Sequence, residues 1–295
     1  MSPDNPTRKV KNVTPRFDVN LSILFTELPL LERPAAAKQA GFDAVEFWWP
    51  FAVAVPSDAE VDKFVSAVQD AGVALVGLNF FAGDMPGGDR GLVSWPARSA
   101  EFRDNIPVVA AIGERLGCTA FNALYGNRVD GASAAEQDDL AAENLTLAAQ
   151  GVTGTVLVEP VSGSPRYPLL TAADVAAVIA RVSSGGMSPA GGPTNLGMLA
   201  DLYHLAVNGD DVDKAIATYT GTPGGIAHVQ IADAPGRGAP GTGELPLDRQ
   251  LADLQAAGYR GWVGLEYKAP ADNPDTTATF DWLPRERRAS AASAR

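Results

Sequence analysis

Four side chains able to bind a metal ion or move a proton stand near the ends of short apolar runs in the second half of the chain. They are Glu159 in the run 155–160, Asp201 in 196–204, Gln230 in 226–233 and Glu266 in 261–267. Such runs are typical of strands buried on both faces, where an unpaired polar group costs about 1–3 kcal/mol. Parallel α/β proteins place their chemistry at the carboxyl ends of such strands. We therefore expect these four residues to face one centre.

Three carboxylates and one amide oxygen around one centre predict a bound cation. The carboxylates would repel one another, and each would raise the proton affinity of its neighbours. A divalent ion removes this conflict, and ligands that are all oxygen favour Mg²⁺ or Mn²⁺. Zinc usually requires His or Cys, and the chain has two histidines and one cysteine. For Asp201 taken alone, capping a local turn is an equal alternative.

Four further residues are candidate substrate contacts, each with a structural alternative. His204 is expected to touch substrate, the alternative being a hydrogen-bonded core histidine. Arg237, in a Gly/Pro loop, could bind an anionic substrate or be an exposed charge. His228 shares a strand face with Gln230 and either orients it or packs. Glu46 fits an ion pair inside the rim at least as well as a catalytic role.

Short β-rich runs alternate with segments of helical period along most of the chain. The expected strands are 17–22, 44–49, 74–80, 119–125, 155–160, 196–204, 226–233 and 261–267. The expected helices are 30–39, 57–72, 97–116, interrupted or kinked near Pro107, 133–150, 171–182, 211–219 and 247–256. This order predicts the α/β class and a single-domain (β/α)₈ TIM barrel. An open doubly wound sheet is the alternative, but no Gly-rich phosphate fingerprint follows the first strand.

The barrel is expected over residues 15–284, between a flexible arm (1–14) and a disordered tail (285–295). The loop 81–96 is long enough to be a candidate lid, and Arg90 within it is interpreted as a solvated charge. The segment 183–193 is interpreted as a flexible insertion on the face away from the chemistry.

Composition limits the partners of the chain. The 295 residues carry a formal net charge of −12 and no basic stripe, which argues against nucleic acid. No long apolar run suggests a membrane span or a secretory signal. The single cysteine, Cys118, excludes an internal disulfide framework, and we expect a cytoplasmic protein. A homo-oligomer is compatible with the sequence.

Seven motifs resemble those of hydroxypyruvate isomerases, which belong to the xylose-isomerase-like TIM barrels. The motifs span 20–27, 40–46, 158–160, 201–204, 228–237, 240–244 and 264–268, and the resemblance runs from about residue 17 to 270. It implies that Glu159, Asp201, Gln230 and Glu266 hold the metal. It also implies that Glu159 and Glu266 donate and accept the proton, and that His204 and Arg237 touch substrate oxygens.

The resemblance implies an aldose–ketose type isomerase acting on a small hydroxy-oxo acid, through an enediolate. The expected reaction is hydroxypyruvate to tartronate semialdehyde. Gln230 favours the isomerases, because ketose epimerases usually have His at this ligand position. The sequence departs from the family pattern at Val161–Ser162 and at 245–247, near the expected pocket.

Three alternatives remain on the same barrel. One is a 2-oxo-tetronate isomerase or ketose 3-epimerase that uses the same site. Another is a phosphodiesterase of the endonuclease IV type, which needs a His-rich three-metal cluster and a basic groove. The third is a non-catalytic sugar-acid binding protein.

Overall fold

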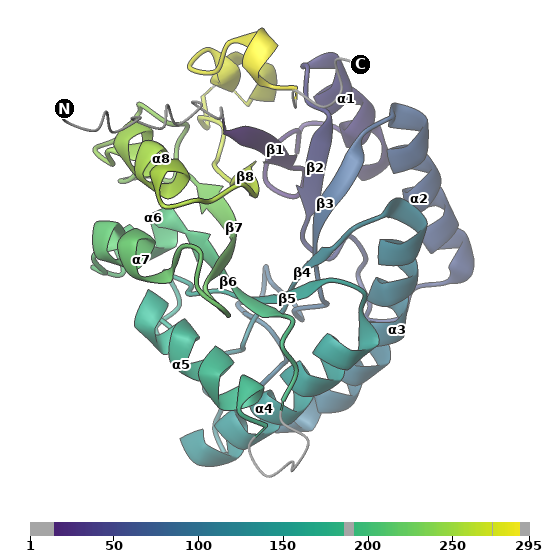
Figure 1. Cartoon of the computed structure of the whole chain (residues 1–295). Coiled ribbons are helices and arrows are strands. Elements are labelled where there is room, and N and C mark those ends of the chain that lie inside the picture. Colours follow the sequence, from purple (N-terminus) through teal and green to yellow (C-terminus); the bar gives the residue numbers. More distant parts are fainter. Residues whose placement is uncertain (1–14, 186–191, 273, 290–295) are drawn as a thin grey trace, which may run out of the picture.

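A computed structural model of the chain describes residues 15–185, 192–272 and 274–289. Eight parallel strands pair in chain order and close into one barrel, as the sequence predicts. The strands are β1 (Arg16–Asn20), β2 (Ala44–Phe47), β3 (Ala74–Asn79), β4 (Ala120–Asn122), β5 (Thr155–Val158), β6 (Leu196–Asp201), β7 (Ile226–Ile231) and β8 (Trp262–Leu265). Figure 1 looks into this barrel, with the helices arranged around it.

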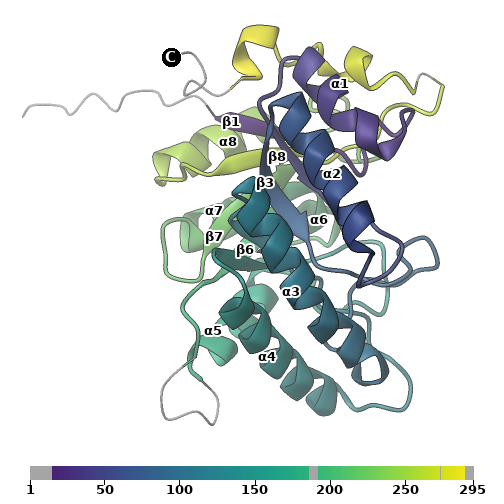
Figure 2. The ribbon, with the colours of Figure 1, turned by 90° about the vertical axis from the view of Figure 1, so that its right-hand side faces the viewer.

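The helices cover the outside of the barrel. They are α1 (Arg33–Gln39), α2 (Asp58–Ala71), α3 (Ser99–Leu116), α4 (Ala134–Gly151), α5 (Ala172–Ser183), α6 (Leu202–Val207), α7 (Val212–Tyr219) and α8 (Leu247–Ala256), with 3₁₀ turns η1 (Leu30–Glu32) and η2 (Pro96–Arg98). Helices α2, α3 and α4 pack side by side, as Figure 2 shows. Within the described ranges, no helix is long and apolar enough to cross a membrane.

Local signals in the sequence define several helix ends. Ser57 and Glu60 form a capping box at the start of α2, and Gly72 ends this helix with a left-handed φ of 66°. Ser133 caps α4 in the same way. Helix α3 runs through Pro107 as one assigned helix, so the interruption considered from the sequence is absent. The proline removes one backbone hydrogen bond, and burial of the apolar face of α3 compensates for the stability lost with it.

The sixth strand is shorter than the predicted range 196–204. Strand β6 ends at Asp201, and helix α6 begins at once. The cause is local, because Asp201 Oδ1 accepts the backbone N–H groups of Tyr203 at 2.8 Å and His204 at 3.2 Å. His204 therefore lies on a helix above the strand end and not on the strand.

The eighth βα unit has no full-length helix in the described residues. Instead, η3 (Thr276–Phe280) and η4 (Arg285–Arg287) close the ring between β8 and α1, in yellow in Figure 1. Phe280 is fully buried, and its ring packs on that of Phe42 with centroids 4.9 Å apart. Arg288 donates to the carbonyl of Ala40 at 2.9 Å. Within the expected tail, residues 285–288 therefore form a short helical turn held against the barrel by these contacts.

Two expectations fall wholly or largely outside the described residues. The expected flexible arm, 1–14, is not described, and neither is 186–191 in the expected insertion 183–193. Helix α5 ends at Ser183 and β6 begins at Leu196, so this connection leads into the amino end of a strand.

The interior of the barrel is polar near its carboxyl end. Along β1, Phe17 points outward and meets Trp282 with ring centroids 5.7 Å apart, whereas Asp18 and Asn20 point inward. Glycines make room for the inward groups. A Cβ on Gly264 would lie 2.6 Å from a carboxylate oxygen of Glu46.

Candidate active site

A cavity of about 1000 Å³ opens at the carboxyl ends of the strands. Glu159, His204 and Glu266 lie in its floor and inner wall. Its outer wall comes from loops, and includes Ser22, Trp48, Phe81, Arg90, Ser162, Arg237 and Lys268. The end of the barrel predicted to carry the chemistry therefore also holds a cavity large enough for a small molecule.

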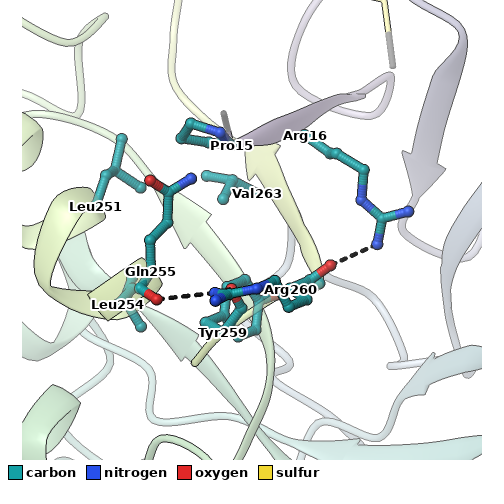
Figure 3. A pocket seen from close by; sticks show the side chains of 9 residues that line it. Pro15, Arg16, Leu251, Leu254, Gln255, Tyr259, Arg260 and Val263 are labelled. Atoms are coloured by element: carbon teal, nitrogen blue, oxygen red, sulfur yellow. Dashed lines mark hydrogen bonds between the residues drawn. The ribbon is translucent and has the colours of Figure 1, made fainter. Parts of the chain in front are cut away.

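A second hollow, of about 20 Å³, lies at the amino ends of β1 and β8 where α8 packs on them (Figure 3). Arg16 Nη2 crosses its edge and donates to the carbonyl of Arg260 at 2.6 Å. No acidic side chain lines this hollow, which has room for about one water. It is a packing crevice at the face that contributes stability in such barrels.

Four ionisable side chains converge at and just beneath the cavity floor, from the ends of β5, β6 and β8 and from α6. Ligand atoms of Glu159, Asp201, His204 and Glu266 all lie within 4.8 Å of one another. All four side chains are buried. A buried cluster of this composition could hold a metal ion.

Asp201 performs two roles at once. Its Oδ1 caps α6, which was the structural alternative to metal binding. Its Oδ2 is buried and accepts no hydrogen bond from a described residue, with Arg237 Nη2 and His204 Nε2 each 3.5 Å away. One oxygen therefore shapes the backbone, and the other remains available to a ligand.

Gln230 lies directly beside Asp201, because β6 and β7 pair these two residues. Its amide nitrogen donates to Glu46 Oε1 at 2.6 Å. Its amide oxygen is buried and accepts no hydrogen bond within the described part of the chain. Glu46 thus turns the oxygen of Gln230 away from itself.

Glu46 and His228, two of the candidate substrate contacts, pair with each other. Glu46 Oε2 lies 2.7 Å from His228 Nε2, and both residues are buried. Neither lines the cavity. They lie beneath the floor, where His228 contacts Glu46 and Glu46 accepts the amide N–H of Gln230, so a contact of either residue with substrate stays a prediction.

Asp18 extends this lower group and was not recognised from the sequence. Its carboxylate lies within 4.8 Å of ligand atoms of Glu46 and His228, and neither of its oxygens has a hydrogen-bond partner among the described residues. Burial, with the charges of Glu46 and Glu266, holds the pKa of Asp18 well above its ordinary value. The neutral carboxyl is therefore favoured here.

Glu266 is held by three donors from distant parts of the chain. Oε1 accepts from Trp48 Nε1 at 2.6 Å and from Asn20 Nδ2 at 3.2 Å. Oε2 accepts from Arg237 Nη2 at 2.5 Å. The guanidinium of Arg237 is thus engaged with protein carboxylates rather than free for a substrate anion, although it lines the cavity.

Arg237 itself is fixed by the loop after β7. Its backbone has a left-handed φ of 58°, which is unfavourable for a residue with a side chain. Asp233 organises the loop, accepting the N–H groups of Gly241 at 2.9 Å and Leu245 at 3.0 Å. The close approach of Gly243 requires glycine, because its Cβ would lie 2.5 Å from Asp233. The polar end of β7 therefore shapes the Gly/Pro loop.

Glu159 receives a donor that sequence reasoning missed. Asn122 Nδ2, at the end of β4, donates to Glu159 Oε2 at 2.7 Å. A strand-end signal existed, since Asn20, Asn79 and Asn122 each end a strand. Because asparagine is also a common turn residue, its position at these three strand ends does not by itself predict a role in the site.

His204 presents a defined tautomer to the cavity. Its Nδ1 accepts the backbone N–H of Ser162 at 3.0 Å and lies 2.7 Å from Ser162 Oγ. Burial, helped by the charge of Arg237, lowers the pKa of His204 to about 3. The neutral ring thus carries its proton on Nε2, which lies 3.5 Å from Asp201 Oδ2 and can donate to a cavity ligand.

The clustered carboxyls oppose one another's ionisation. Burial raises the pKa of Glu266 to about 7, although Arg237 acts in the opposite direction. Burial and the charges of Glu266 and Asp201 hold the pKa of Glu159 well above its usual range. Burial also raises the pKa of Asp201. These are the shifts expected where several buried acids face one space and a single guanidinium, that of Arg237, offsets only part of their charge.

The loop 81–96, considered as a lid, forms one wall of the cavity and is attached to the barrel. Gly91 N donates to the carbonyl of Ala82 at 3.0 Å, and Ser94 N to that of Tyr125 at 2.8 Å. Leu92 and Val93 are fully buried. The far end of this loop is therefore part of the core.

The chain matches the family model described as "Xylose isomerase-like TIM barrel" over residues 34–286. A putative hydroxypyruvate isomerase of Streptomyces coelicolor is 55% identical, over 93% of this chain and 98% of that protein. The hydroxypyruvate isomerase of Escherichia coli is 32% identical, over 91% of this chain and 98% of its own. The chain belongs to the xylose isomerase-like TIM barrels and, within them, to the hydroxypyruvate isomerase family of enzymes.

A solved structure gives a useful contrast. The crystal structure titled AP endonuclease, family 2, from Brucella melitensis is 31% identical with a TM-score of 0.79, covering 91% of this chain and 98% of that one. A phosphodiesterase of the endonuclease IV type needs a His-rich metal cluster. This chain has two histidines, and they lie in two different acid-rich groups.

Proposed function

We propose that this enzyme converts hydroxypyruvate to tartronate semialdehyde, with Mg²⁺ or Mn²⁺ at the carboxyl ends of β5 to β8. The observation that carries the proposal is the buried convergence of Glu159, Asp201 and Glu266, with Gln230 paired beside Asp201. The names of the relatives at 55% and 32% identity support this substrate.

The donor set fits a hard divalent cation. The buried oxygens of Asp201 (Oδ2) and Gln230 (Oε1) lack hydrogen-bond partners among the described residues, which is costly unless a ligand satisfies them. Glu159, Asp201, Gln230 and Glu266 would hold the ion through oxygen, which favours Mg²⁺ or Mn²⁺ over zinc. When bound, such an ion supplies positive charge that stabilises negative charge developing on the substrate oxygens.

The chain's own residues move the protons. One of the pair Glu159 and Glu266 removes a proton from C3 of hydroxypyruvate, and the electron pair forms an enediolate. The other member returns a proton to C2, and the hydroxyl proton passes from O3 to O2. His204 donates from Nε2 to a substrate oxygen, because Ser162 occupies its Nδ1.

The test is incubation with hydroxypyruvate in D₂O, with and without Mg²⁺ or Mn²⁺. We expect tartronate semialdehyde carrying deuterium at C2, little product after chelation, and recovery when metal is returned. A 2-oxo-tetronate and a panel of ketoses, run in parallel, separate the neighbouring activities. Binding without deuterium incorporation would indicate a sugar-acid binding protein, and full activity after chelation would contradict the metal proposal.

A further inference from the structure

Several cationic side chains line the cavity, and they differ in what holds them. Arg98 pairs with Asp89 at 2.6 Å and with Glu101 at 2.7 Å. Arg237 pairs with Glu266. Arg90 is partly buried in the cavity wall and, like Arg33 and the exposed Lys268 of the same wall, forms no ion pair with a described residue. This guanidinium therefore has charge to offer a ligand.

The hydrogen bonds of Arg90 leave one edge of its guanidinium open. Nη1 donates to the carbonyls of Asp89 at 2.7 Å and Met85 at 2.9 Å. Within the described residues, Nε and Nη2 have no hydrogen-bond partner. These two N–H groups form a planar edge that matches the two oxygens of a carboxylate.

Arg90 is also held in place by its neighbour in sequence. Gly91 adopts a left-handed φ of 107°, and a Cβ there would lie 1.9 Å from the carbonyl oxygen of Leu124. The chain beside Arg90 therefore lies directly against the backbone after β4, where only glycine fits. A cation fixed in this way loses little freedom when it binds an anion.

The charge of Arg90 acts on the catalytic end of the cavity. It is among the charges that lower the pKa of His204, together with that of Arg237. Arg90 and His204 thus face the same space from the loop after β3 and from α6. A small acid lying between them would place one end at the buried carboxylates and the other at Arg90.

We propose that Arg90 binds the carboxylate of the substrate and makes the site selective for hydroxy-oxo acids over neutral ketoses. This inference rests on the proposed function for the identity of the acid, but not for the contact itself. Arg237 is less suited to this role, because its Nη2 is committed to Glu266. Since the net charge of −12 gives no long-range attraction for an anion, a local cation is needed.

The experiment measures binding of hydroxypyruvate to the metal-free full-length protein by calorimetry. Dihydroxyacetone, which has CH₂OH in place of the carboxylate, is the neutral probe. In Arg90→Met we expect hydroxypyruvate to bind at least tenfold more weakly, and dihydroxyacetone to bind within twofold of wild type. In Arg90→Lys, which keeps the charge without the planar edge, we expect an intermediate loss. Arg166→Met removes an equal charge that is exposed and paired with Asp130, and should change neither affinity.

Each outcome is decisive. Unchanged hydroxypyruvate affinity in Arg90→Met overturns the inference, and so does an equal loss for both probes, which would show a structural role. If wild type binds hydroxypyruvate through Arg90 but does not turn it over, the inference stands and the proposed reaction fails. With turnover, Arg90→Met should raise KM for hydroxypyruvate and change kcat less than threefold. Arg90→Lys covers the case in which Arg90→Met does not fold.

Discussion

The two halves of the barrel rim carry opposite kinds of polar group. Oxygen acceptors lie at or next to the last residues of β5 to β8, namely Glu159, Asp201, Gln230 and Glu266, whereas β1, β3 and β4 end at Asn20, Asn79 and Asn122. Two of the asparagines donate to an acid at the end of the neighbouring strand, Asn20 of β1 to Glu266 after β8 and Asn122 of β4 to Glu159 after β5. One half therefore supplies ligand oxygens, and in the other half neutral asparagines hold two of these acids in position, beside the buried acids Asp18 of β1 and Glu46 of β2.

This division explains how the acids are tolerated without a full set of basic partners. Neutral amide donors orient a carboxylate but cancel little of its charge, so the acids keep raising one another's pKa. The remaining negative potential is available to a divalent ion. A rim filled with arginines would position the acids equally well and would compete with that ion.

The largest effect is expected from Glu266→Gln, in the acceptor half. The amide keeps the shape of the side chain but cannot take a proton, so we expect about a 10³-fold loss of kcat with hydroxypyruvate. Glu244→Gln changes an exposed glutamate in the loop after β7 and should retain wild-type activity. Circular dichroism checks the fold of both. Wild-type kcat in Glu266→Gln would remove this residue from the mechanism.

A smaller loss is expected from Asn122→Leu and Asn20→Leu, in the donor half. Asn122→Leu removes a donor from Glu159, and Asn20→Leu removes the donor that Glu266 shares with Glu46. Residues that orient metal ligands typically contribute about 10–100-fold to metal affinity or activity. Metal titration of the purified variants measures this directly. Asn195→Leu removes an asparagine that bonds backbone carbonyls at the amino end of the barrel, and should leave metal affinity intact. Equal affinities in all three variants would refute the division of the rim.

The acceptor half should also make the metal-free protein less stable as pH rises. The pKa of Glu266 is raised to about 7, so between about pH 4.5 and pH 7 the folded protein binds more protons than the unfolded chain. Stability therefore falls across this window, and we expect Tm several degrees lower at pH 8 than at pH 5. Calorimetry with and without Mn²⁺ measures this. A slope unaffected by Mn²⁺ or by Glu266→Gln would place its origin elsewhere.

The smallest effect is expected from Ser162→Ala. The hydroxyl lies near His204 Nδ1, but the backbone N–H that fixes the tautomer remains in the variant. We expect kcat/KM within about fivefold of wild type, because a neutral hydrogen bond contributes about 1 kcal/mol or less. A loss as large as that of Glu266→Gln would show that the hydroxyl itself takes part in proton transfer.

The predictions made from sequence succeeded where neighbouring residues carry the signal. Ser57 with Glu60 defines the start of α2, and Gly72 defines its end. The predictions failed where a side-chain hydrogen bond to the backbone ends a strand that the hydrophobic pattern alone would continue. The apolar run to His204 continues past Asp201, but the cap formed by Asp201 turns the chain into a helix.

The amino-acid sequence by itself determined the barrel, the family and the acceptors at the ends of β5 to β8, because periodicity, caps and motifs are properties of short segments. Only the tertiary structure decided which donor meets which acid. Asn20 and Glu266 are 246 residues apart and meet because β1 closes the barrel against β8. Arg237 is drawn to Glu266, while Arg90 is left facing the cavity. The physical reason is that the role of a charged or amide side chain depends on the group nearest to it. Closure of the barrel determines which group that is.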